Sequence, residues 1–188
     1  MANSNLKSAT SANSKSNLNS NLKEGADVFS AEDRERKITL QVGDAAPSFE
    51  LENADGVKIS LGDFVGKKVV LYFYPKDMTP GCTTEACEFS DEFAEFAKKG
   101  AFVVGVSPDS VASHEKFATA KALKHVLLSD PQKEVAKIYG VWQVRKNYGK
   151  EYLGVVRTTF IIDENGKIEK IYKSVKAAGH AAKVLADL

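Results

Sequence analysis

The sequence predicts an α/β domain in which a central mixed sheet is flanked by helices. Three observations lead to this prediction. Apolar runs at 69–74 and 101–106 are typical of buried strands. Each run precedes a segment with helical periodicity, at 83–99 and at 111–123. The chain then closes with a predicted hairpin and a helix over 177–188.

The first element expected in the folded part is an N-terminal hairpin. Residues 48–51 and 57–61 alternate apolar and polar side chains around Asp55-Gly56, which favours a tight turn between two strands. A loop over 62–68 leads from this hairpin to the strand 69–74. We expect one domain over 37–188, with its regular structure starting near residue 41.

The helix predicted at 83–99 has an apolar stripe and ends at Gly100 after two lysines. The stripe consists of Ala86, Phe89, Phe93, Phe96 and Ala97. After the strand 101–106 and a turn at 107–109 we expect a helix at 111–123, a short strand at 126–128 and a helix at 132–139. Asn165-Gly166 predicts a hairpin between 158–162 and 167–172. Trp142 is expected in core or loop packing, and Asp130-Pro131 in a turn.

Residues 1–36 differ in composition from the rest of the chain. The segment is rich in Ser and Asn, and no acidic residue precedes Glu24. Such a segment buries too little apolar area to offset its ordering entropy, so we expect a disordered tail, with a charged linker over 33–37. Transit peptides are also Ser-rich and poor in acids, but here the first arginine is Arg34, so organelle targeting is the less favoured interpretation.

Composition narrows the classes of function. The 188 residues carry a net charge of +1, which gives no global field for nucleic acid or membranes, and no apolar run is long enough to span a bilayer. Two cysteines do not form a disulfide framework, so a reducing, cytoplasmic location is expected. A C-x4-C spacing without a nearby histidine argues against metal, and we expect His114, His125 and His180 in surface or capping roles.

Both cysteines lie in the stretch 75–87, between the first buried strand and the first predicted helix. A thiolate at a helix start is favoured by free N–H groups, but a helix end supplies only about 0.3 to 1 kcal/mol. Lowering a thiol pKa by two units needs about 2.7 kcal/mol. Cys82 is therefore a candidate nucleophile that needs a nearby cation, although an inert buried cysteine would fit the same position.

Cys87 lies five residues after Cys82. In an intact helix two such Cα atoms are about 8.6 Å apart, whereas a disulfide requires less than about 7 Å. The two cysteines can therefore bond only if the start of the helix unwinds, which fits a transient redox pair better than a structural bridge. An unrelated small residue at position 87 remains the alternative.

Three further residues are candidates for the site. The Thr79 hydroxyl can both accept and donate a hydrogen bond near the sulfur, although its position alone favours a turn or cap role. Arg157 precedes the strand 158–162, and a parallel neighbouring strand would bring it to the same sheet edge as Cys82; otherwise it is a solvated charge. Pro75 shapes the loop.

The stretch 73–87 closely resembles the signature of the bacterioferritin comigratory protein / peroxiredoxin Q subfamily of peroxiredoxins. The resemblance extends from about residue 42 to residue 188 and includes 127–130, 139–142 and 154–163. It implies a thioredoxin-like fold. It also implies a thiol peroxidase that needs no cofactor or metal, reduces hydrogen peroxide and organic hydroperoxides, and is recycled by thioredoxin or a similar dithiol.

The resemblance also implies roles for individual residues. Cys82 corresponds to the peroxidatic cysteine, and Cys87 to the resolving cysteine that some members have. Pro75, Thr79 and Arg157 correspond to the rest of the active site, and Glu85 to a residue that orients Arg157. Because both cysteines belong to one chain, a monomer is expected.

Two other functions stay open at this level. A thiol–disulfide oxidoreductase on the same fold would be expected to carry C-x-x-C, which this sequence lacks. A non-enzymatic holdase or interaction protein would need an exposed apolar patch.

Overall fold

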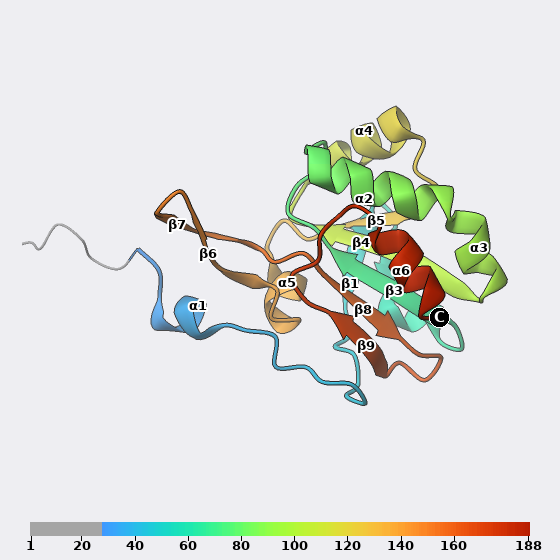
Figure 1. Ribbon diagram of the computed structural model, residues 1–188, viewed down its shortest axis with the longest axis horizontal. Helices are drawn as coiled ribbons and strands as arrows, with labels where there is room; N and C mark the ends of the chain where they lie inside the picture. The colour runs from blue at the N-terminus through green and yellow to red at the C-terminus, as the bar shows by residue number, and fades with distance from the viewer. Residues whose placement is uncertain (1–27) are drawn as a thin grey trace, which may run out of the picture.

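A computed structural model describes residues 28–188, so the first 27 residues of the predicted tail lie outside the described residues. Seven strands form the main sheet (Figure 1). These strands are β1 (Glu50–Asn53), β2 (Lys58–Ser60), β3 (Lys68–Phe73), β4 (Ala101–Ser107), β5 (Val126–Ser129), β8 (Thr158–Ile162) and β9 (Ile168–Tyr172). Their spatial order is β2-β1-β5-β4-β3-β8-β9.

The sheet is mixed, as predicted. β3, β4 and β5 are parallel, and the strands on either side of these three run antiparallel to their neighbours. The central strands β3 and β8 are buried along almost their whole length, which agrees with the apolar runs 69–73 and 160–162 within them. The predicted N-terminal hairpin is confirmed as β1–β2, and the predicted Asn-Gly hairpin as β8–β9.

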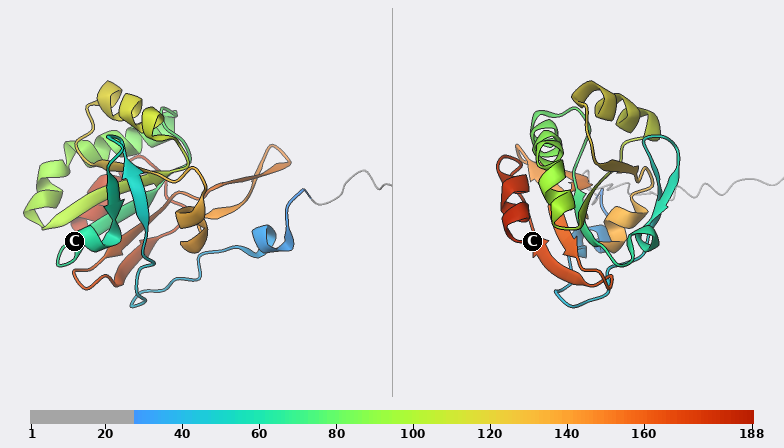
Figure 2. Two further views of the ribbon diagram at one scale, coloured as in Figure 1. Left: turned by 180° about the vertical axis from the view of Figure 1, so that it is seen from behind. Right: turned by 90° about the vertical axis from the view of Figure 1, so that its right-hand side faces the viewer.

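Helices cover both faces of the sheet (Figure 2). One face is covered by α2 (Pro80–Asp91), α3 (Phe93–Lys98), α4 (Val111–Lys121) and α6 (His180–Ala186). The opposite face is covered by α5 (Glu134–Ile138) and the 3-10 helix η1 (Leu61–Phe64). No helix within residues 28–188 is long and apolar enough to cross a membrane.

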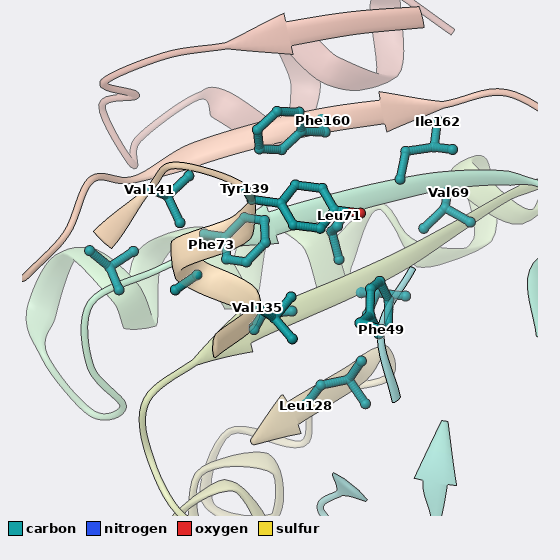
Figure 3. Close-up of a cluster of buried hydrophobic side chains, with 14 of the residues drawn as sticks. Phe49, Val69, Leu71, Phe73, Leu128, Val135, Tyr139, Val141, Phe160 and Ile162 are labelled. Atoms are coloured by element: carbon teal, nitrogen blue, oxygen red, sulfur yellow. The ribbon is translucent and has the colours of Figure 1, made fainter. Parts of the chain in front are cut away.

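Each face of the sheet has its own apolar core. Figure 3 shows the core beneath α5, where Phe73, Tyr139 and Phe160 meet around Leu71. The ring centroids of Phe73 and Tyr139 are 5.1 Å apart, as are those of Tyr139 and Phe160. Such contacts between rings hold β3 and β8 against the same helix, and thereby fix the strand ends at which the predicted site residues lie.

The helix expected at 83–99 differs from the observed structure at both ends. It begins at Pro80, because proline is well suited to the first helical position, where no N–H partner is needed. It also divides at Glu92 into α2 and α3. Phe93, which was expected on the buried stripe, is consequently 38% exposed, whereas Phe89 and Phe96 are fully buried.

Two elements were not predicted. A separate two-stranded hairpin, β6 (Trp142–Asn147) and β7 (Lys150–Val155), projects from the main sheet (Figure 1). A short helix, α1 (Ala31–Glu35), forms where the sequence indicated a tail and a charged linker. Ser30 caps this helix, and Arg36 pairs with Glu32 and Asp33 at 2.8 Å each.

The segment after α1 is part of the folded domain. The side chains of Ile38 and Leu40 pack against the core under α5. The backbone of Lys37 passes so close to Gly140 that a Cβ atom there would lie 2.4 Å from the Lys37 carbonyl oxygen. Gly140 also has a φ of +71°, so both its conformation and this crossing require glycine.

Candidate active site

Cys82 lies in the first turn of α2, directly beyond the carboxyl end of β3. Thr79 is the extended residue before the helix, with φ −78° and ψ 150°, and its carbonyl accepts a hydrogen bond of 2.8 Å from the Thr83 amide. The Cys82 side chain is 2% exposed and makes no disulfide. The strand-to-helix position predicted for this cysteine is therefore confirmed.

Arg157 supplies the cation that the sequence required. Its Nη2 donates a hydrogen bond of 3.1 Å to the Cys82 sulfur. The expected parallel neighbour is wrong: β8 runs antiparallel to β3, and Phe73 pairs with Thr158. The start of β8 therefore meets the end of β3, which brings Arg157 to the edge where α2 begins.

Glu85 lies one turn after Cys82, is fully buried, and forms an ion pair with Arg157 through its Oε2 atom. Burial raises the pKa of Glu85 to about 7, although the Arg157 guanidinium acts in the opposite direction. Among the described residues, the Oε1 atom has no hydrogen-bond partner. Glu85 thus holds one nitrogen of the guanidinium while the other nitrogen reaches the sulfur.

Cys87 lies on the same helix as Cys82 and is half-buried and free. The intact α2 keeps the two residues five positions apart, at the separation that excludes a bond between them. The next residue, Glu88, connects α2 to α6, because its two carboxylate oxygens accept hydrogen bonds of 2.9 and 3.0 Å from the Gly179 amide. Gly179 is the residue that precedes α6.

Thr79 and Pro75 lie on the loop that leads into α2. The Thr79 hydroxyl donates to the Lys76 carbonyl at 3.0 Å and makes no hydrogen bond with Cys82. Pro75 is exposed and, with Arg157, lines a cavity of about 260 Å³. The structure therefore brings both residues near the site, but among residues 28–188 it is Arg157 whose side chain hydrogen-bonds to the sulfur.

A buried polar cluster that the sequence did not predict holds this loop in place. Asp77 accepts hydrogen bonds from the hydroxyls of Tyr74 and Ser113, both at 2.7 Å, and its Oδ2 lies 2.9 Å from His114 Nδ1. Hydrogen bonds to Asp77 lower its pKa, although burial opposes this. No local motif connects positions 77 and 114, so sequence reasoning had no signal for this pair.

The predicted surface or capping roles of the three histidines are wrong, because all three are buried. His125 contacts the hydroxyls of Tyr72 and Ser90 at 2.7 and 3.1 Å. His180 contacts the Thr159 hydroxyl at 2.8 Å. Burial lowers the pKa of both His125 and His180 to about 4, so both are neutral at pH 7.

The arrangement around Cys82 suits nucleophilic chemistry at sulfur. A permanently charged guanidinium that donates to a sulfur stabilises the thiolate, which is the reactive form of cysteine. Its remaining N–H groups can stabilise charge that develops on a substrate oxygen. Within residues 28–188, no three His, Cys, Asp or Glu side chains are grouped as ligands for a metal ion.

Residues 42–171 match the sequence pattern of the AhpC/TSA family. A putative peroxiredoxin bcp of Helicobacter pylori is 57% identical over 149 residues, which are 79% of this chain and 98% of that protein. Peroxiredoxin Bcp of Bacillus subtilis is 46% identical over 151 residues, covering 80% of this chain and 96% of its own.

Solved structures show the same relationship. The bacterioferritin comigratory protein of Xanthomonas campestris, described for its alkyl peroxide reduction, is 37% identical with a TM-score of 0.73. It covers 80% of this chain and 96% of its own. A PrxQ variant of Xylella fastidiosa is 34% identical with a TM-score of 0.75, over 79% of this chain and 94% of its own. The predicted thioredoxin-like fold is thereby confirmed.

Proposed function

Because the chain belongs to the AhpC/TSA family, among the peroxiredoxins called Bcp or PrxQ, and is a thiol-dependent peroxidase, we propose that Cys82 is the residue that attacks the peroxide. The thiolate attacks one oxygen of the peroxide, so that an S–O bond forms as the O–O bond breaks. Cys82 becomes a sulfenic acid, and the other oxygen leaves, with one added proton, as water or an alcohol.

The contact between Arg157 and the Cys82 sulfur carries this proposal. Its 3.1 Å hydrogen bond joins a charged donor to the sulfur in a buried setting, where such an interaction is strong. Glu85 acts on the reaction through Arg157, by fixing the direction of the guanidinium. Thr79 and Pro75 shape the loop through which the peroxide approaches.

The second half of the cycle belongs to Cys87. After oxidation of Cys82 the first turns of α2 unwind, and the Cys87 sulfur attacks the sulfenic sulfur. A disulfide forms and one water leaves. The spacing of five residues on one helix supports this role, because it keeps the two thiols apart until the helix opens.

Thioredoxin or a similar dithiol then reduces the disulfide, and its own two thiols become a disulfide. The substrates are hydrogen peroxide and organic hydroperoxides, in keeping with the alkyl peroxide reduction described for the Xanthomonas campestris relative. A monomer suffices, since both cysteines lie on one chain. Two free cysteines suit a reducing compartment such as the cytoplasm.

The central test compares hydrogen peroxide consumption by the wild type and by Cys82→Ser, with a dithiol reductant in both reactions. The variant should lose peroxidase activity. Full peroxidase activity in Cys82→Ser would exclude Cys82 as the nucleophile. A peroxide-independent disulfide reductase activity in the wild type would favour the oxidoreductase alternative, and suppression of client aggregation by both proteins alike would favour a holdase.

A second experiment tests Cys87. The Cys87→Ser variant should complete the first turnover and then accumulate as a sulfenic acid or an intermolecular disulfide, which mass spectrometry detects. Sustained turnover of this variant with thioredoxin would exclude Cys87 as the resolving residue.

A further inference from the structure

The cavity beside Arg157 extends away from Cys82 toward the projecting hairpin β6–β7. It is bounded by the loop before α2, by the hairpin and by the segment after β9. Cys82 does not line it, and Arg157 connects the sulfur to this space. Its walls include side chains of Pro75, Arg145, Tyr152, Val155, Arg157 and Val175.

Arg145 on β6 gives this cavity an unbalanced positive charge. Its side chain is half-buried and lies within ion-pair distance of no carboxylate among residues 28–188. Arg36 and Arg157, by contrast, each contact acidic side chains. No Asp or Glu lines the cavity. A half-buried guanidinium without a carboxylate partner favours a bound anion at this position.

Apart from the two arginines and Ser174, the lining is apolar or aromatic. Tyr152 pairs directly with Arg145 across the hairpin, so the two side chains lie on one face. A Cβ atom at Gly154 would lie 3.0 Å from the Tyr152 ring and 3.8 Å from the Arg145 side chain, so the missing side chain leaves room for both. Val155 and Val175 complete a surface suited to a short carbon chain.

We propose that this cavity binds the carboxylate end of a small organic hydroperoxide. Arg145 holds the carboxylate, and the carbon chain lies against Tyr152, Val155 and Val175. The hydroperoxide group then reaches Arg157 and Cys82. The volume of about 260 Å³ lies just below the usual range of small-molecule pockets, which limits the substrate to a short chain. This inference rests on the proposed peroxidase reaction of Cys82 and assigns it a preferred substrate class.

The test compares a short aliphatic hydroperoxide that ends in a carboxylate with the methyl ester of the same molecule. The wild type should show a kcat/KM about tenfold higher for the acid, through KM, because a hydrogen bond to a charged group has this order of effect. In Arg145→Gln the ratio of kcat/KM for the acid to kcat/KM for the ester should fall to about one, and in Arg145→Lys this ratio should be partly restored. Lys150→Gln, an equal charge change on the exposed part of the same hairpin, should keep it.

Equal kcat/KM for acid and ester in the wild type would overturn the inference, as would an unchanged preference in Arg145→Gln.

A separate measurement does not depend on turnover. Benzoate binding to Cys82→Ser, followed by calorimetry, should weaken about tenfold when Arg145→Gln is added; equal binding would also overturn the inference. Loss of turnover on every peroxide by the wild type would instead refute the proposed function, and benzoate would still report on the cavity.

Discussion

The hydrogen bonds between Glu88 and Gly179 predict how fast the two cysteines can join. Glu88 follows Cys87 directly, and its carboxylate fixes this part of α2 to the start of α6. When α2 unwinds, Cys87 must move and this connection must break. Glu88 therefore stabilises the closed helix against the form that produces the disulfide.

The magnitude follows from the type of contact. A single intramolecular hydrogen bond contributes about 1 kcal/mol to stability. Its loss in Glu88→Ala should raise the population of the opened helix about fivefold. If opening precedes disulfide formation in a rapid equilibrium, the rate of that step should rise by the same factor. Glu88→Gln retains an acceptor oxygen, so its rate of disulfide formation should lie between those of Glu88→Ala and the wild type.

The assay is a rapid-mixing experiment on reduced protein. Peroxide is added, thiols are alkylated at set times, and mass spectrometry separates sulfenic acid from disulfide. Asp91→Ala is the matched control, because Asp91 is an exposed acid one turn later on α2. A rate in Glu88→Ala equal to that in Asp91→Ala would refute the idea that Glu88 restrains the opening.

Three further predictions concern buried polar and charged side chains. Arg157→Lys should slow the first attack on hydrogen peroxide about tenfold in stopped-flow measurements. A lysine ammonium cannot reproduce the guanidinium that contacts both Glu85 and Cys82. An unchanged rate of attack would contradict this. His114→Ala leaves the buried Asp77 carboxylate without its 2.9 Å partner at Nδ1. This should lower the urea-measured free energy of unfolding by about 2 kcal/mol, and a loss under about 1 kcal/mol would count against the contact. The pKa of His125 is about 4 in the folded protein and 6.5 in the unfolded chain, so its contribution to folding stability is full above pH 6.5 and is lost as pH falls toward 4. The stability of His125→Gln should therefore fall less steeply over this window, by up to about 3 kcal/mol. Parallel plots of stability against pH for the variant and the wild type would be inconsistent with a neutral buried histidine.

The sequence was informative wherever a short segment carries its own periodicity. The strands β3 and β4 contain long apolar runs, and Asn165-Gly166 marks a tight hairpin after β8, so these elements could be predicted. The position of Cys82 followed in the same way, because a strand that leads into a helix places the connecting residue at a sheet edge. The need for a cation was also apparent, since a helix end alone does not sufficiently stabilise a thiolate.

What the sequence did not reveal depends on pairing between distant segments. Arg157 reaches Cys82 because β8 is antiparallel to β3, and strand direction is not encoded in either strand alone. The same holds for Asp77 and His114, which are joined only when α4 packs beside the loop. The hairpin β6–β7 has mixed polar and apolar residues on half-exposed strands, so it lacked a clear alternating pattern.

The backbone crossing at Gly140 bears on the smallest part of this chain that can fold alone. The family match spans residues 42–171, yet Lys37 and Ile38 lie against Gly140 and Ile38 and Leu40 contribute to the core, all before residue 42. At the other end, Ala181 and Val184 of α6 are buried beyond residue 171. A fragment cut at the limits of the family match would leave apolar surface open on both faces of the sheet. The autonomous folding unit is therefore longer than the region shared with the family, and truncation studies should keep at least residues 37–188.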